Sequence, residues 1–485
     1  MNQEKTIEEY INSVREIISQ KDSPILACVH SYGCQLNFSD GEKLKGMLAK
    51  MGFGLTDKPE DAGLVIFNTC AVRENAEDRV FGNLGFLKHY KEKNPEMIIG
   101  LCGCMTGLDH VVEKINNSYK FVDIVFGTSA LDKFPKLLFD KLSGKKHAFD
   151  TNEYNMPVEG LEQKRDSKFK ASVPIMFGCN NFCTYCIVPY VRGRERSRKP
   201  ENIIQEVKEL VASGYKEIML LGQNVNSYGK DLPDGINFPE LLERINAIDG
   251  DFIIRFMSSH PKDAGKELID TIIRCEKIGK HFHLPVQSGS NDILEKMNRR
   301  YTVERYMETI NYARSIIPDF SFTTDIIVGF PNESEEDFEK TLELMKRVGY
   351  DNIYSFIYSK RSGTKAAEIN DLISDEEKSQ RMTRLLALQR EISTENYKRF
   401  IGRKMRVLVD GKGKREGWLT GKSSEFIIVE FEGDESLTGS FADVEIIGAK
   451  NWAVTGKLIE KRRNKNGYNF NGKRIRKAYT GRSEI

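Results

Sequence analysis

The sequence lacks the features that would place the protein in a membrane or outside the cell. No apolar run among its 485 residues approaches the roughly 20 residues that a membrane span requires. The N-terminus is acidic and polar, without the basic and then apolar stretches of a secretory signal. Nine cysteines without such a signal favour reduced thiols over disulfides. We therefore expect a cytoplasmic protein with no membrane partner.

The chain as a whole also lacks a strong net charge, because its formal value is only +2. This small value hides an uneven distribution. The segment from Lys457 to Ile485 carries +8, so the residues before it carry −6. Tyr468, Phe470 and Tyr479 lie among these basic residues. Positive charge mixed with aromatic rings suits contact with phosphates and stacking on bases, and a solvated tail without a partner is the alternative.

Three cysteines with C-x3-C-x2-C spacing form the most informative motif. They are Cys179, Cys183 and Cys186, which we call the loop trio. Three thiolates from one short loop can hold three irons of a 4Fe-4S cluster, which leaves one iron open for a ligand that is not a protein side chain. A structural zinc site would need a second C-x2-C pair or distant histidines, and no second pair is present. Three unrelated buried cysteines are the other alternative.

The residues before this motif alternate apolar runs with helical segments, as in a doubly wound parallel α/β sheet. The expected strands are 25–30, 64–68, 97–101 and 122–126. Cysteines follow the first three strands, at the edge where open α/β sheets bind ligands: Cys34, Cys70 and Cys104, which we call the sheet trio. Their placement predicts a second cluster. Cys102 ends the same strand as Cys104 and, on spacing alone, also suits a ligand position.

Six further apolar runs alternate with helical segments and predict a central (β/α)6 partial TIM-type barrel. The expected strands are 173–177, 218–221, 252–257, 281–286, 320–328 and 353–358. The loop trio follows the first of them, on the face where such barrels carry out their chemistry. A small OB-like five-stranded β-barrel is expected last, with strands at 404–409, 416–420, 426–431, 443–447 and 458–459.

These motifs together resemble the radical S-adenosylmethionine (SAM) methylthiotransferase family. The loop trio, with Tyr185 before its last cysteine, matches the signature of the radical SAM superfamily. The sheet trio lies in Gly-Cys-Gln, Asn-Thr-Cys and Gly-Cys-Met segments that resemble the cysteine motifs of the family's N-terminal domain. The resemblance selects Cys104 over Cys102 and implies an auxiliary 4Fe-4S cluster on the sheet trio. The C-terminal barrel resembles the TRAM domain of tRNA-modifying enzymes.

The resemblance also implies which segments contact SAM. Polar and glycine-rich segments end several strands of the central barrel, where backbone can approach a ligand and amides can hydrogen-bond to it. The expected cofactor-binding residues are Tyr185, Gly222, Gln223, Gln287, Ser288 and Asp325. His260, His281 and His283 lie nearby and are expected to be packed or hydrogen-bonded without an assigned role.

Four arginines follow the loop trio directly: Arg192, Arg194, Arg196 and Arg198. Such a density of guanidinium groups suits an anionic substrate, such as the phosphates of RNA or the carboxylate of SAM. We therefore expect them to bind substrate RNA, and a solvated loop is the alternative.

The motifs and periodicities together predict a chain of six segments that acts as an enzyme. The segments are an N-terminal helical extension (1–23), the α/β domain (24–142), a linker (143–169), the radical SAM core (170–398), the TRAM domain (399–460) and a basic tail (461–485). The segment Leu220–Gly229 most resembles the family type that methylthiolates N6-(dimethylallyl)adenosine beside the tRNA anticodon, with two SAM molecules and two 4Fe-4S clusters. Threonylcarbamoyl-adenosine and a ribosomal-protein aspartate are alternative substrates, and an RNA-binding iron–sulfur protein is the non-enzymatic alternative.

The implied partners follow from that chemistry. They are the anticodon loop of tRNA, an electron donor such as flavodoxin or ferredoxin, and iron–sulfur assembly proteins. The enzyme itself is expected to be a monomer. A loop base is a suitable target because it can be unstacked without opening a duplex.

Overall fold

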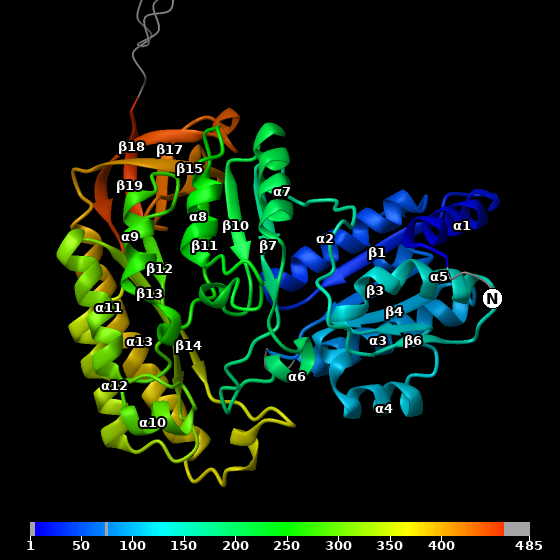
Figure 1. Ribbon diagram of the computed structural model, residues 1–485, viewed down its shortest axis with the longest axis horizontal. Coiled ribbons are helices and arrows are strands. Elements are labelled where there is room, and N and C mark those ends of the chain that lie inside the picture. The colour runs from blue at the N-terminus through cyan, green and yellow to red at the C-terminus, as the bar shows by residue number, and fades with distance from the viewer. Residues whose placement is uncertain (1–4, 73–75, 460–485) are drawn as a thin grey trace, which may run out of the picture. The chain divides into compact units, whose positions relative to one another are not determined.

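The computed structural model describes residues 5–72 and 76–459 (Figure 1). The chain divides into two compact units, of which the first comprises residues 1–399 and 424–426 and the second comprises residues 400–423 and 427–485. No helix in the described part of the chain is both long enough and apolar enough to cross a membrane. The first unit holds the N-terminal sheet and the central barrel.

The N-terminal sheet has six parallel strands in the order β2-β1-β3-β4-β5-β6. Their bounds are β1 Leu26–Ser31, β2 Gly54–Leu55, β3 Leu64–Thr69, β4 Ile98–Gly103, β5 Ile124–Phe126 and β6 Ala148–Asp150. Alternate residues of β3 join different apolar clusters, Leu64 and Ile66 on one side and Val65 and Phe67 on the other. Helices therefore cover both faces, which confirms the doubly wound α/β prediction.

Five helices supply the two layers. One layer contains α1 Ile7–Ser19, α2 Gln35–Lys50 and α5 Phe134–Leu142. The other contains α3 Ala76–Lys93 and α4 Asp109–Ser118. The expected N-terminal extension is part of this core, because Ile11, Val14 and Ile18 of α1 are buried in the first layer.

The sheet differs from the sequence prediction at two edges. The two-residue strand β2 and the three-residue strand β6 were not predicted, because neither contains an apolar run long enough to show strand periodicity. Strand β6 pairs with β5 and lies within residues 143–169, which were expected to be a linker. The sheet therefore extends beyond residue 142.

The central barrel has six main parallel strands in two groups, β11-β10-β7 and β12-β13-β14. Their bounds are β7 Lys170–Pro174, β10 Glu217–Leu221, β11 Ile253–Phe256, β12 His281–His283, β13 Ser321–Val328 and β14 Asn352–Ile357. A parallel bridge from Ile254 to Ile278 lies between the groups. The helices that cover the strands are α7 Pro200–Ala212, α8 Phe238–Asn246, α9 Lys266–Arg274, α11 Val303–Ile316, α12 Glu335–Val348 and α13 Asp375–Lys398. The predicted partial barrel is confirmed.

Four short elements carry or support the loop trio. Strand β8 (Met176–Phe177) pairs antiparallel with β9 (Arg196–Ser197), and the loop trio lies between them. Helix α6 (Val188–Arg192) follows the trio, and α10 (Asn291–Lys296) follows β12. The cysteine loop therefore begins after an additional short hairpin strand and not directly at the end of β7.

The second unit is a closed five-stranded barrel in the order β15-β16-β17-β19-β18. Its strands are β15 Lys404–Lys412, β16 Trp418–Ser423, β17 Ile428–Glu432, β18 Phe441–Ala449 and β19 Val454–Leu458. Alternate residues of β18, namely Ala442, Val444 and Ile446, are buried, as expected for strands whose inner face fills a small barrel. The predicted five-stranded barrel is confirmed, but its last strand lies at Val454–Leu458 and not at 458–459. The basic tail 461–485 lies outside the described residues.

Candidate active site

The sheet trio comes from the ends of three neighbouring strands. Cys34 precedes α2 after β1, Cys70 follows β3, and Cys104 begins a short 3-10 helix after β4. The Cys34 and Cys104 sulfurs lie 4.0 and 3.6 Å from the same Asn37 Oδ1 atom. A Cβ atom placed on Gly33 would lie only 2.5 Å from the Cys70 sulfur. The three cysteines therefore converge as predicted.

Asn37 holds the loops of the sheet trio together. Its Nδ2 donates to the carbonyls of Tyr32, at 2.9 Å, and Thr69, at 2.6 Å. These bonds connect the loop after β1 to the end of β3 and turn Oδ1 toward the thiols. Gly103 supports the same arrangement, because its φ is +97° and a Cβ there would lie 2.4 Å from the Thr69 carbonyl oxygen. The sequence analysis did not predict this role for Asn37.

Arg192 reaches the sheet trio from helix α6. Its Nε donates to the Cys104 sulfur at 3.1 Å, and Nη2 donates to Asn37 Oδ1 at 2.5 Å and to Asp40 at 3.2 Å. Burial raises the pKa of the Cys104 thiol to about 12, against the lowering effect of the Arg192 guanidinium. Metal binding to this thiol therefore requires proton release, as at other cysteine sites.

Cys102 lies apart from this arrangement. Its side chain belongs to the apolar layer that contains Ile66 and Phe126. Cys104 instead packs with Ala71 and Val191. Strand β4 ends at Gly103, whose φ of +97° turns the chain before Cys104 and separates the two thiols, which supports Cys104 as the ligand candidate.

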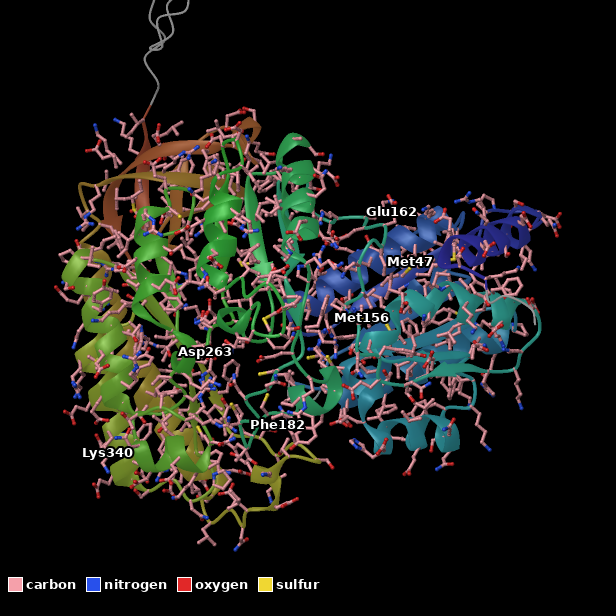
Figure 2. The ribbon with its side chains drawn as sticks, in the orientation of Figure 1. Met47, Met156, Glu162, Phe182, Asp263 and Lys340 are labelled. Atoms are coloured by element: carbon pink, nitrogen blue, oxygen red, sulfur yellow. The ribbon has the colours of Figure 1, made fainter. Side chains whose placement is uncertain are left out.

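The loop trio is held in one irregular loop. Gly178 starts it with a φ of +77°, and a Cβ there would lie 1.9 Å from the Arg194 carbonyl oxygen, so only glycine fits. The Cys179 amide donates to the Gly193 carbonyl at 3.1 Å. Phe182, labelled in Figure 2, has a φ of +48°. These constraints make the loop turn sharply between its first two cysteines.

Residues after α10 anchor the same loop from the opposite side. Asn298 Nδ2 donates to the Phe182 carbonyl at 2.9 Å, and the Thr184 amide donates to the Met297 carbonyl at 3.1 Å. Arg299 Nη1 donates to the Cys183 sulfur at 3.3 Å. Arg299 Nη2 donates to the Pro285 carbonyl at 2.8 Å, which positions the guanidinium. Sequence reasoning missed Arg299, because nothing near it in the chain marks it as a thiol partner.

Burial dominates the electrostatics of the loop trio as well. It raises the pKa of Cys179 to about 11 and that of Cys186 to about 12. Within residues 5–72 and 76–459, no three cysteine, histidine or acidic side chains have a preformed metal-binding geometry. Both trios are candidate cluster sites because of their residue type and their placement, and not because their sulfurs already have the geometry of a bound cluster.

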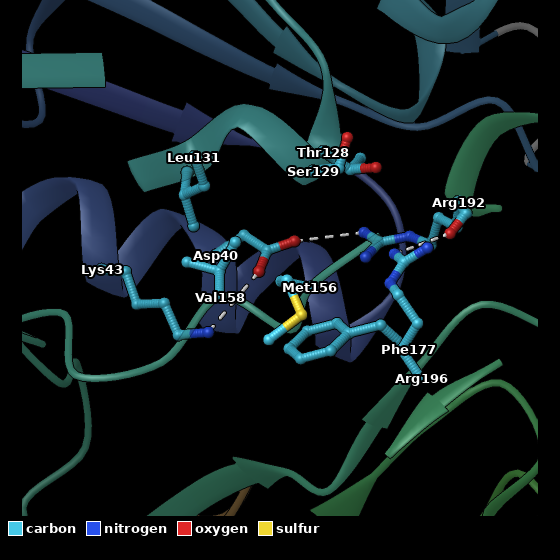
Figure 3. Close-up of a pocket in the computed structure, with 10 residues that line it drawn as sticks. All are labelled: Asp40, Lys43, Thr128, Ser129, Leu131, Met156, Val158, Phe177, Arg192 and Arg196. Carbon is cyan, nitrogen blue, oxygen red and sulfur yellow. Dashed lines mark hydrogen bonds and ion pairs between the residues drawn. The ribbon is translucent and has the colours of Figure 1, made fainter. Parts of the chain in front are cut away.

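The arginine-rich segment differs from its prediction. Arg192, Arg196 and Arg198 are buried, and Arg198 forms ion pairs with Glu159 and Glu206 at 2.6 and 2.8 Å. Figure 3 shows Arg192 and Arg196 lining a small pocket together with Asp40 and Lys43.

This burial corrects the expected RNA contact for three of the four arginines. Arg192 meets Asn37 and Asp40, and Arg198 meets Glu159, which are residues distant in sequence that the local charge density could not reveal. Arg194 alone among the four is exposed, with its guanidinium 4.5 Å from the centre of the Phe182 ring.

Comparison with known proteins identifies three regions. Profiles match residues 27–127 as Uncharacterized protein family UPF0004, residues 173–345 as the Radical SAM superfamily and residues 398–459 as a TRAM domain. A protein of Thermoanaerobacter pseudethanolicus named tRNA-2-methylthio-N(6)-dimethylallyladenosine synthase is 53% identical over 434 residues, which cover 89% of this chain and 92% of the relative. The chain belongs to the tRNA-2-methylthio-N(6)-dimethylallyladenosine synthase family.

Another member of this synthase family is similar to this chain over nearly its whole length. The protein of Caldicellulosiruptor saccharolyticus is 50% identical, with 88% of this chain and 91% of the relative covered.

Among solved structures, the cobalamin-dependent SAM radical enzyme OxsB has a TM-score of 0.51 at 14% identity, covering 77% of this chain and 56% of OxsB. The radical SAM methyltransferase TsrM from Kitasatospora setae has a TM-score of 0.51 at 13% identity, with 71% and 75% covered. These likenesses show the fold alone.

The synthase-family chain has buried polar atoms that fit a polar cofactor. Five residues after β10 and β11 carry buried side-chain atoms without a hydrogen-bond partner: Gln223, Asn224, Asn226, Ser259 and His260. Buried polar groups are rarely left unpaired, so a ligand or water is expected here. The amino, carboxylate and ribose groups of SAM offer suitable partners for such atoms.

The remaining predicted SAM contacts have different surroundings. Tyr185 packs beside Ile327 and Phe330, and its hydroxyl accepts from Arg299 at 3.4 Å. A Cβ on Gly222 would lie 2.7 Å from the Met176 side chain, so this glycine also serves packing.

Three further residues lie in the loop after β12 and within β13. Gln287 has a φ of +71°, and its amide donates to the Asp325 carbonyl at 2.9 Å. The Asp325 carboxylate is 29% exposed, 3.4 Å from His283 Nε2, and so is accessible to a ligand. Ser288 is fully buried with its hydroxyl 3.4 Å from that of Thr341, so it supports the loop where it lies.

Proposed function

We propose that this chain methylthiolates carbon 2 of N6-(dimethylallyl)adenosine next to the anticodon of tRNA. The observation that carries the proposal is the near full-length similarity to a 53% identical relative with that printed name. Two converging cysteine trios on one compact unit support it. The TRAM domain at 398–459 supports an RNA substrate, because small five-stranded barrels of this type bind nucleic acid.

The six cysteines divide into two proposed ligand sets. The loop trio would hold the radical SAM 4Fe-4S cluster, and the sheet trio would hold the auxiliary 4Fe-4S cluster. When bound, the clusters and SAM supply one-electron chemistry, radical reactivity toward an unactivated C–H bond, and the transferred methylthio group. The protein supplies three thiolates to each cluster and leaves one iron of each without a protein ligand.

The residues around the loop trio have proposed roles in binding SAM. Gln223 offers an unpaired buried amide oxygen, and Asp325 offers an accessible carboxylate. Gly222 has no side chain and so allows backbone to approach the ligand, and the side-chain amide of Gln287 offers a further polar contact. Tyr185 and Ser288 hold the loops that carry these groups.

We further propose the working context of the enzyme. The segment boundaries remain as predicted, except that strand β6 extends the N-terminal sheet into residues 143–169. An electron donor such as flavodoxin or ferredoxin would reduce the radical SAM cluster, and iron–sulfur assembly proteins would load both sites. A monomer in the cytoplasm, where tRNA is modified, fits these partners.

Nucleoside analysis of tRNA from a deletion strain tests the function. We expect the 2-methylthio group to disappear while N6-(dimethylallyl)adenosine accumulates. The intact gene should restore the group, and alleles carrying Cys34→Ala or Cys179→Ala should not. Unchanged methylthio-dimethylallyladenosine in the deletion strain would contradict the proposal. Loss of methylthio-threonylcarbamoyl-adenosine instead would assign the enzyme to the other nucleoside.

A further inference from the structure

Helix α6 connects the loop trio to the sheet trio. It begins two residues after Cys186 and ends at Arg192. Its Val191 packs with Ala71 and Cys104 in one apolar cluster, and the Val191 carbonyl accepts from Thr128 at 3.1 Å. The sheet trio is therefore completed on one side by the chain that leaves the loop trio.

A glycine permits this close packing. A Cβ on Gly107 would lie 3.3 Å from Val191 Cα, closer than most side chains approach a backbone atom. Gly107 ends the short 3-10 helix that begins at Cys104. The Cys104 turn and the end of α6 consequently lie against each other, with Arg192 at their junction.

The guanidinium of Arg192 is fixed by three acceptors. Only 5% of the residue is exposed. Nη2 donates to the oxygens of Asn37 and Asp40, while Nε donates to the Cys104 sulfur. Because a guanidinium is rigid and planar, the two oxygen acceptors orient the Nε–H group that faces sulfur. Asn37 also contacts the Cys34 sulfur, so the same network reaches a second member of the sheet trio.

A structural ion pair alone does not account for this geometry. Asp40 also lies 3.9 Å from Lys43, a second buried cation that can balance its charge (Figure 3). An N–H donor on a cluster thiolate stabilises negative charge on that ligand, and hydrogen bonds to the sulfurs are among the factors that set the reduction potentials of iron–sulfur clusters. The placement of Nε therefore has a chemical consequence beyond packing.

We propose that Arg192 is a positioning residue for the auxiliary cluster. It holds Cys104 in place and, by donating Nε–H to the cysteine sulfur, favours the reduced form of the cluster. This inference rests on the proposed function, because it assumes that the sheet trio binds a 4Fe-4S cluster. The loop trio and the sheet trio are then joined by a residue that belongs to the chain of one and acts on the other.

The test isolates the auxiliary site in the full-length chain. The variant Cys179→Ala/Cys183→Ala/Cys186→Ala is the parent, and Arg192→Gln, Arg192→Lys or Arg198→Lys is added to it. Each protein is reconstituted anaerobically with iron and sulfide. Iron and sulfide content is measured, and the midpoint potential is determined by titration monitored by electron paramagnetic resonance.

We expect Arg192→Gln to lower the midpoint potential. The expected change is about tenfold in the ratio of oxidised to reduced cluster, or about 59 mV for a one-electron couple. Arg192→Lys should give a smaller shift of the same sign, because lysine keeps the charge but lacks the planar group that reaches sulfur and both oxygens together. Arg198→Lys is the matched control, since Arg198 is buried in the same segment and its contacts are to Glu159, Glu206 and the Pro174 carbonyl.

The outcomes separate the inference from the proposed function. A parent variant that folds and binds no cluster contradicts the proposed role of the sheet trio. A cluster whose potential is the same in the parent and in Arg192→Gln overturns the inference and leaves that role intact. If Arg192→Gln does not fold, Arg192→Lys decides, because an unshifted potential overturns the inference and a lowered one supports it.

Discussion

The loop trio lies within eight consecutive residues, 179–186, whereas the sheet trio spans residues 34–104. The loop trio is close in sequence and is shaped by its own backbone, as in the left-handed conformation of Gly178, with one anchor from Asn298 to the Phe182 carbonyl. The sheet trio is positioned by strand order, because β1, β3 and β4 are neighbours and end at one edge. Two sets of three cysteines thus arise in different ways, the loop trio from a short sequence motif and the sheet trio from the order of strands in the sheet.

The two trios nevertheless share one device. Each has a buried arginine that donates to one cysteine sulfur, Arg299 to Cys183 and Arg192 to Cys104. Each arginine is also held by oxygen acceptors from other segments, including the Pro285 carbonyl for Arg299 and Asp40 for Arg192. The two sites bring their cysteines together in different ways, but in each of them an arginine hydrogen-bonds to one cysteine sulfur.

The largest expected effect separates the trios by function. Cys179→Ala should abolish both SAM cleavage and methylthio transfer, because every later step needs the radical. Cys34→Ala should abolish methylthio transfer and keep SAM cleavage. Chromatography with mass spectrometry measures 5′-deoxyadenosine and the methylthio nucleoside in the same reaction. Loss of SAM cleavage in a folded Cys34→Ala protein would contradict two independent sites.

Glycine substitutions should separate the trios by structure. Gly178→Ala places a Cβ 1.9 Å from a carbonyl oxygen in the loop, and Gly103→Ala places one 2.4 Å from a carbonyl oxygen in the sheet. Forcing a side chain into such backbone costs about 1–3 kcal/mol before any clash is relieved. We expect the first variant to lose iron from the loop trio and the second from the sheet trio.

Iron content after reconstitution, measured beside electron paramagnetic resonance spectra, distinguishes the two losses. Gly144→Ala is a control with a similar φ of +99° and open space around the added Cβ. Equal loss from both sites in either variant would show that the trios are not structurally separate.

Arg299 should affect the loop trio alone. Arg299→Lys removes the fixed donor to Cys183 and should slow SAM cleavage by about tenfold, equivalent to about 1.4 kcal/mol in the barrier. Arg305→Lys provides the control, because Arg305 is exposed and pairs with Glu308 on the surface of α11. An unchanged rate of 5′-deoxyadenosine formation in Arg299→Lys would reject the role of this contact.

The smallest expected effect concerns Arg194, the exposed arginine beside Phe182 in the loop of the loop trio. Arg194→Ala should weaken tRNA binding a few-fold and reduce the salt dependence of binding by about one unit, as for loss of a single phosphate contact. Binding is measured by fluorescence anisotropy at several salt concentrations. Lys21→Ala, an exposed change on the N-terminal segment, is the control. Equal salt slopes for Arg194→Ala and the unchanged protein would remove Arg194 from the RNA interface.

The predicted fold agreed with the structure wherever a pattern was long or repeated. The continuous apolar runs of β3 and β4 and the alternation of strands with helices in the central barrel both carried enough residues to be recognised. Strands β2 and β6 were missed because they are short and are stabilised by pairing with a neighbour. Edge strands of this length depend on the sheet that they join and have little pattern of their own.

The arginine-rich segment shows the same limit for side chains. Its charge density predicted an RNA-binding surface, yet Arg192, Arg196 and Arg198 are buried. A buried arginine requires acceptors, and those of Arg198 come from Glu159 and Glu206. Which carboxylate meets which guanidinium depends on how elements pack, so the charge of a segment does not determine its exposure.

The sequence by itself identified the loop trio as a ligand set, because the C-x3-C-x2-C spacing places three thiols within eight consecutive residues. It also determined the α/β, partial-barrel and small-barrel order, because periodicity is a local property. Only the tertiary structure decided that Cys34, Cys70 and Cys104 meet around Asn37 and that Arg192 completes them. Those contacts join residues up to 155 positions apart, and such distances are closed by packing alone.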